Sequence, residues 1–138
     1  MSGGRALRLI IGKKLDPAVL GQLRKAALDL MDEAKVPAKQ RPGLSAVVEE
    51  LGTNVMEHSG AAWMELAVVT ADGKIFLSIS DNGKAFDPVS NMQSRDFSGD
   101  LGNEEGRNLG FYMLKNLTQS MRYLREEGGV NRVMLQLA

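Results

Sequence analysis

The sequence contains no cysteine, carries no net charge and has few aromatic residues. Without cysteine, disulfide bonds, thiol catalysis and zinc–thiolate sites are excluded. Lysine plus arginine and aspartate plus glutamate each number 17, so the net charge of zero gives no electrostatic reason to expect nucleic acid or a membrane surface as a partner. Aromatic residues make up only 5% of the chain, which argues against a base-stacking platform for single-stranded nucleic acid.

Long apolar runs are also missing. No run approaches the roughly 20 residues that a membrane-spanning helix requires. The apolar stretch near the N-terminus lacks the length and the cleavage site of a signal peptide. We therefore expect a cytoplasmic protein with no membrane partner.

Hydrophobic periodicity predicts one domain, residues 1–138, with elements in the order β-α-α-β-β-loop-α-β-β. The expected elements are a strand over 5–11, helices over 16–34 and 43–58, strands over 61–70 and 74–80, a helix over 107–120 and a hairpin over 121–138. Hairpin turns are expected at Asp72-Gly73 and Gly128-Gly129. Helices and hairpins together predict an α+β fold, a two-layer α/β sandwich in which helices cover one face of a mixed, mostly antiparallel sheet.

Three segments carry residues suited to chemistry, and the first is "VVEELGTNVMEHSG" over 47–60. Glu50, Asn54 and His58 are four residues apart and share one side of the expected helix. Glutamate can deprotonate a hydroxyl, and the amide oxygen of asparagine is a hard ligand suited to Mg²⁺. The alternative is a solvated polar stripe beside the core, with His58 as a structural residue at the helix end.

The second segment, "SISDNGKAFDP", follows an expected strand directly. Asp81 at the strand end can accept a hydrogen bond, for example from the exocyclic amine of a purine. Gly83 permits a positive φ or a close approach of the backbone to a planar ligand. The alternative is an ordinary Asp-Asn-Gly turn.

The third segment, "GNEEGRNLGFYM", places glycines before a helix expected to begin near Arg107. The free N–H groups at a helix N-terminus bind phosphates, and Arg107 adds a positive charge. The alternative is a flexible loop followed by a helix. Residues 81–106 before it form a long polar stretch, and we expect 89–105, which have few apolar side chains, to be a mobile lid.

The order and spacing of the three segments resemble the GHKL, or Bergerat-fold, ATP-binding family. That family has a helical Glu/Asn box, an Asp-x-Gly box after a strand, a variable lid and a Gly-rich box opening a helix. The corresponding stretches here are "EELGTNVMEH", "DNGKAFDP" and "GRNLGF". Within the family, the chain is most similar to small bacterial anti-sigma-factor serine kinases, which share the E-x-x-x-N-x-x-x-H pattern and a helix-plus-hairpin ending.

The resemblance implies ATP and Mg²⁺ as ligands and gives each box a role. It implies that Glu50 is the general base, that Asn54 holds Mg²⁺, that Asp81 reads adenine and that Gly83 lets the ring approach. Further nucleotide-binding positions implied by the boxes are Ala85, Gly106, Arg107, Asn108, Leu109 and Gly110. Ala85 and Asn108 stand where the family usually has glycine, and asparagine is the residue after glycine that best tolerates left-handed backbone geometry.

The resemblance implies a serine/threonine protein kinase that binds a sigma factor, an antagonist protein or both in bacterial partner switching. Relatives of this type are often homodimers. Two alternatives stay open at this point. One is a non-catalytic module whose partner choice depends on the bound nucleotide, and the other is a detached histidine-kinase ATPase domain that acts on a partner chain.

Overall fold

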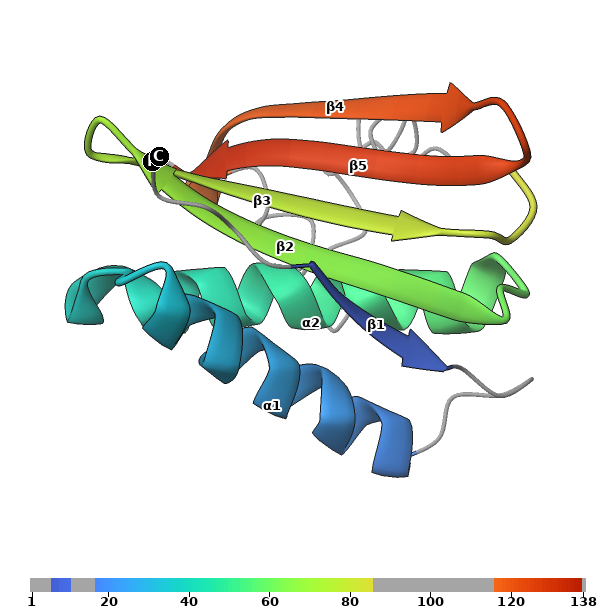
Figure 1. The fold of residues 1–138 in the computed structure, drawn as a ribbon, viewed down its shortest axis with the longest axis horizontal. Coiled ribbons are helices and arrows are strands. Elements are labelled where there is room, and N and C mark those ends of the chain that lie inside the picture. The colour runs from blue at the N-terminus through green and yellow to red at the C-terminus, as the bar shows by residue number, and fades with distance from the viewer. Residues whose placement is uncertain (1–5, 11–16, 86–115, 138) are drawn as a thin grey trace, which may run out of the picture.

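The computed structural model describes residues 6–10, 17–85 and 116–137 (Figure 1). Its elements are β1 (Ala6–Ile10), α1 (Pro17–Glu33), the 3-10 turn η1 (Ala38–Gln40), α2 (Arg41–His58), β2 (Trp63–Ala71), β3 (Lys74–Asp81), β4 (Thr118–Glu126) and β5 (Val130–Leu137). Both long helices have a polar side, and none of the helices in this part of the chain is long and apolar enough to cross a membrane.

The described strands form one five-stranded sheet in the order β1-β2-β3-β5-β4. Each neighbouring pair is antiparallel, so no parallel pair occurs among these strands. Both long helices lie on the same side of the sheet (Figure 1), where α1 contacts β1 and β2 and α2 contacts β3. The predicted α+β sandwich is therefore confirmed.

The core fills the space between the helices and the sheet. Alternation along β2, β3 and β5 turns every second side chain toward the helices. The buried strand residues are Met64, Leu66, Val68, Ile75, Leu77, Ile79, Val133, Leu135 and Leu137. The long helices contribute apolar residues at helical spacing, among them Leu23, Leu30, Met31, Leu44, Val47, Val48 and Leu51. Full burial of each large apolar side chain stabilises the fold by about 1.5–3 kcal/mol, so α2 is held firmly against the sheet.

Both predicted hairpin turns are present. Asp72 and Gly73 have φ values of 54° and 75°, as a tight turn between β2 and β3 requires. Gly128 and Gly129 have φ values of 83° and 79° between β4 and β5. Glycine tolerates this left-handed geometry because it lacks a Cβ atom.

Several element boundaries differ from the sequence prediction. Helix α2 begins at Arg41 instead of near Gly43, because η1 leads directly into it and Pro42 suits a first turn. The helix predicted over 107–120 is wrong at its end. Residues 116 and 117 are helical, but Thr118–Ser120 belong to strand β4, where Thr118 pairs with Leu137. The rest of that predicted helix lies outside the described residues.

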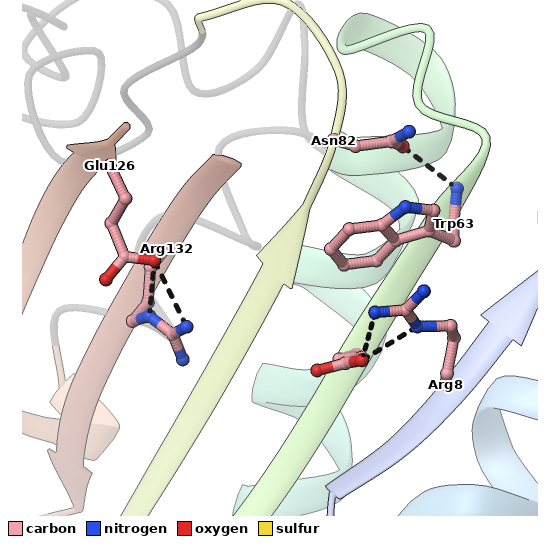
Figure 2. A network of polar contacts seen from close by, with 6 residues as sticks. Arg8, Trp63, Asn82, Glu126 and Arg132 are labelled. Atoms are coloured by element: carbon pink, nitrogen blue, oxygen red, sulfur yellow. Dashed lines mark hydrogen bonds and ion pairs between the residues drawn. The ribbon is translucent and has the colours of Figure 1, made fainter. Parts of the chain in front are cut away.

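The face of the sheet turned away from the helices carries charged pairs near one end. Arg8 Nη2 lies 2.6 Å from Glu65 Oε2. The Cζ atom of the same guanidinium is 3.9 Å from the centroid of the Trp63 ring (Figure 2). Arg132 contacts Glu126 at 3.1 Å (Figure 2). Exposed ion pairs of this kind stabilise the folded state by at most about 1 kcal/mol each. Their main effect is to make this face of the sheet polar.

Candidate functional site between helix α2 and the end of strand β3

Helix α2 places two predicted site residues on the border of its buried side. Leu51 is buried, whereas Glu50 and Asn54 are half-buried. Gly52 lies on the side facing α1, where an added Cβ would come within 2.4 Å of a Leu23 methyl carbon. The close packing of the two helices therefore fixes the rotation of α2 and presents Glu50 and Asn54 along its other edge.

The adjacent carboxylates Glu49 and Glu50 lie in different surroundings. The Glu49 carboxylate forms an ion pair with Arg24 of α1. It also lines a groove between the two helices. Glu50 stands one turn before Asn54, on the row that leads toward the sheet end. The ion pair with Arg24 therefore accounts for Glu49, whereas Glu50 lies on the row of α2 that carries Asn54.

Asp81 ends strand β3 and points into the interior, where it is only 4% exposed. Its Oδ1 accepts a hydrogen bond from the Gly83 N–H at 2.8 Å and another from Asn131 Nδ2 at 3.1 Å. The next residue, Asn82, turns outward, and its Oδ1 accepts a hydrogen bond from the Ala62 N–H at 2.8 Å. It accepts another from the Trp63 N–H at 3.1 Å (Figure 2). The Asp-Asn-Gly sequence therefore fastens the end of β3 to the beginning of β2.

Gly83 has a structural neighbour that the sequence did not reveal. An added Cβ would lie 2.3 Å from the Ser59 carbonyl oxygen, at the C-terminal cap of α2. The φ angle of Gly83 is not positive, so the close approach of the backbone explains the glycine. The Lys84 N–H also donates to the Ser59 carbonyl at 2.8 Å. This contact joins the turn after Asp81 to the end of the helix that carries Asn54.

Asn54 and Asp81 meet in one pocket between α2 and the sheet. The pocket is lined by Leu51, Asn54, Val55, Ser59, Ile79, Asp81, Asn131 and Val133. Its volume is about 20 Å³, enough for about one water molecule, so an adenine ring requires the pocket to widen. A larger hollow of about 320 Å³ lies on the opposite face of the sheet, but its lining includes none of the predicted site residues. The chemistry therefore points to the smaller pocket.

Two polar side chains of this pocket have atoms without a hydrogen-bond partner among the described residues. The Asn54 side chain makes no hydrogen bond to another described residue. Within the same part of the chain, the hydrogen bonds to Asp81 use Oδ1 and leave Oδ2 unused. A carboxylate oxygen suits an exocyclic amine, and an amide oxygen suits Mg²⁺. No group of three acidic, histidine or cysteine side chains gathers among the described residues.

Asn131 is a site residue that sequence reasoning missed. It lies on β5 opposite Asp81 and is 3% exposed. The signal was present in the alternation of β5, because Asn131 occupies the same inward row as Val133 and Leu135. A polar residue on an otherwise apolar inward row requires hydrogen-bonding partners, and such positions are often functional.

The other predicted positions are only partly placed. Ala85 is exposed at the end of the described stretch, and His58 is half-buried at the last residue of α2. The phosphate-box residues Gly106, Arg107, Asn108, Leu109 and Gly110 lie outside the described residues, as does the expected lid over 89–105. The structure thus brings together Asn54, Asp81 and Gly83, with Glu50 one turn away on α2.

Comparison with solved structures finds a similar fold in two bacterial proteins. A chain of the SiaB–SiaC complex from Pseudomonas aeruginosa superposes with a TM-score of 0.61 at 11% identity, over 96% of this chain and 88% of that one. The Acinetobacter baumannii histidine kinase AdeS gives a TM-score of 0.50 at 15% identity, over 97% of this chain and 67% of that one. No curated protein matches the sequence.

A family model provides the decisive comparison. The model of the histidine kinase-like ATPase domain matches residues 14–137, which include all three boxes. The fold likeness agrees with this match. The chain therefore belongs to the histidine kinase-like ATPase domain family.

Proposed function

We propose that this protein is an ATP-dependent serine/threonine kinase of the anti-sigma-factor type, acting in bacterial partner switching. The observation that carries the proposal is the pocket shared by Asn54 of α2 and Asp81 of β3. Membership of the histidine kinase-like ATPase family supports ATP as the ligand. The kinase activity and the partners are the finer part of the proposal.

Asp81 would recognise the adenine base. Its Oδ1 accepts from Gly83 and Asn131, and its Oδ2, which has no donor among the described residues, would accept from the exocyclic amine. The remaining lining is mostly apolar, as a planar ring requires. Burial of the carboxylate makes this recognition selective, because an unpaired hydrogen-bonding group inside the pocket costs about 1–3 kcal/mol.

Asn54 would orient the triphosphate through Mg²⁺. Its amide oxygen supplies one neutral ligand, and the bound ion would neutralise charge on the phosphate oxygens. Because Asn54 stands on a helix packed against the core, its position is fixed before the ligand arrives. The amides around Gly106 and Gly110 would cover the phosphates.

Glu50 would act as the general base. The serine or threonine oxygen of the substrate attacks the γ-phosphorus while the bond from that phosphorus to the ADP oxygen breaks. The hydroxyl proton passes to the Glu50 carboxylate. The products are a phosphorylated protein and ADP, so no further reactant is needed.

The substrate would be an antagonist protein, and the second partner a sigma factor. The fold neighbour from the SiaB–SiaC complex was solved as an assembly of two proteins, which supports a protein partner. A homodimer is part of the same proposal. A non-catalytic, nucleotide-dependent binding module is the outcome to expect if ATP binds but no phosphate is transferred.

The adjacent glutamates offer a matched test. The purified protein, Glu50→Gln and Glu49→Gln are each incubated with γ-labelled ATP and candidate antagonist domains. Glu50→Gln should lower phosphoryl transfer by about 10²–10⁴-fold and leave ATP affinity nearly unchanged. Glu49→Gln should lose only the exposed ion pair with Arg24, at most about 1 kcal/mol of stability, and keep its activity. Full transfer by Glu50→Gln would refute the mechanism.

A further inference from the structure

We propose that Asn131 and Arg125 are positioning residues that fix the Asp81 carboxylate and thereby set the preference for adenine over a 6-oxopurine. This inference rests on the proposed nucleotide site and adds residues that lie outside its boxes. Both residues come from the β4–β5 hairpin, where they form a cross-strand pair. Asn131 also pairs in register with Asp81 on β3, so the three residues form one row across three strands.

The surroundings of Asn131 determine how its amide is oriented. Its Oδ1 accepts from Arg125 Nη1 at 2.9 Å and from the Tyr123 hydroxyl at 2.6 Å. Its Nδ2 donates to the Lys84 carbonyl at 2.8 Å and to Asp81 Oδ1 at 3.1 Å. A guanidinium only donates and a carbonyl only accepts, so exchanging the oxygen and nitrogen of the amide would break both sets of contacts. The buried amide therefore has a single satisfactory orientation.

This orientation determines which oxygen of Asp81 remains for a ligand. The Asn131 amide and the Gly83 N–H together hold Oδ1, and within the described residues Oδ2 has no such donor. Rotation of the carboxylate would give up two hydrogen bonds in a buried site, each costing more than it would in water. Oδ2 is therefore presented in one direction, as an acceptor. An amine donor satisfies it, whereas the carbonyl oxygen of a 6-oxopurine is repelled.

Arg125 holds the same arrangement from the outside. Its Nη1 donates to the Gly83 carbonyl at 2.8 Å as well as to Asn131 Oδ1. The guanidinium thus bridges the amide that orients Asp81 and the turn whose N–H binds Asp81. Although the residue is exposed, its contacts are directed inward, and among the described residues it forms no ion pair. Arg125 therefore acts on the Asp81 carboxylate indirectly, through the Asn131 amide and the Gly83 turn.

The chain provides a matched control on the same strand. Arg122 is also exposed on β4, but it lies on the opposite face of the sheet and lines the hollow there. Replacing either arginine removes one positive charge from β4. Only the Arg125 substitution removes hydrogen bonds to Gly83 and Asn131.

The experiment measures binding of ADP and of inosine diphosphate by calorimetry to the full chain and its variants. The unmodified protein should prefer ADP, and Arg125→Gln should lower the ratio of the two affinities about tenfold. Arg125→Lys, which keeps a donor, should recover part of the ratio, and Arg122→Gln should leave it unchanged. Thermal midpoints show that each variant is folded. If Arg125 had a purely structural role, its replacement would lower the affinities for both nucleotides equally and leave their ratio unchanged.

A second variant addresses the buried residue directly. Asn131→Asp keeps the acceptor for Arg125 and Tyr123 but turns a carboxylate oxygen toward Asp81 and the Lys84 carbonyl. It should abolish the preference for ADP. If the unmodified protein prefers ADP and both variants keep that ratio, this inference is wrong while the nucleotide site stands. Equal affinity of the unmodified protein for the two nucleotides would also refute it. If neither nucleotide binds, the proposed function fails and this inference fails with it.

Discussion

Replacement of Gly83 by alanine tests whether the turn after β3 is fastened to the end of α2. The new Cβ would lie 2.3 Å from the Ser59 carbonyl oxygen and 2.6 Å from the Ser59 Cβ. Relaxed contacts between carbon atoms need about 3.5–4.0 Å, so the two segments must separate by about 1 Å. Ser59 cannot yield easily, because its Oγ donates to the Val55 carbonyl at 2.9 Å and accepts from the Ala61 N–H at 3.2 Å.

The expected loss of stability follows from these contacts. Overpacking of this kind costs about 1–3 kcal/mol. Separation also removes the hydrogen bond from the Lys84 N–H to Ser59, for about 1 kcal/mol more. A total of about 3 kcal/mol corresponds to a thermal midpoint lower by about 10 °C in a chain of this size. The Gly83 N–H would also move away from Asp81, so ADP affinity should fall as well.

Urea denaturation followed by circular dichroism measures the change. Gly21→Ala is the matched control, because Gly21 lies in α1 with open space around its Cβ position. That variant should gain up to about 1 kcal/mol from better helix propensity. If Gly83→Ala is as stable as the unmodified protein, the contact between the turn and α2 is not the constraint inferred here.

Two further substitutions separate the parts of the proposed nucleotide site. Asp81→Asn should weaken ADP binding at least tenfold in calorimetry, because the new amide can place a donor against the adenine amine. Unchanged ADP affinity would show that Asp81 does not contact the nucleotide. Asn54→Ala should abolish the increase in ATP affinity that Mg²⁺ provides, measured as titrations with and without the ion, and a persisting increase would place the metal elsewhere.

The sequence predicted the elements whose patterns are local. Asp72-Gly73 and Gly128-Gly129 mark their turns by residue type alone, because left-handed geometry restricts the choice of residue. Alternation in β2, β3 and β5 identifies the buried rows. Thr118–Ser120 were wrongly predicted as helix because the preceding apolar spacing is helical. Their strand conformation depends on pairing with the distant residues of β5, a contact that no local pattern encodes.

Some residues of the candidate site could likewise be predicted from local sequence motifs, and others could not. Asn54 and Asp81 could be identified from their boxes, and the structure brings them into one pocket. The partners that orient Asp81 could not, since Asn131 is 50 residues away and reaches it only through the register of β3 and β5. The need for glycine at position 83 could not be seen in the sequence either. It arises because a side chain there would collide with the Ser59 carbonyl at the end of α2. Sequence motifs therefore identify candidate site residues, whereas the hydrogen-bond partners of those residues depend on the three-dimensional fold.

A calorimetric titration of the full chain with ATP and Mg²⁺ measures nucleotide binding to this protein. We expect saturable binding that Asp81→Asn weakens. We also expect a higher thermal midpoint, because a ligand that binds only the folded state stabilises it. Absence of binding of both ATP and ADP up to millimolar concentrations would contradict this expectation. The pocket between α2 and β3 would then have no nucleotide to explain its polar residues.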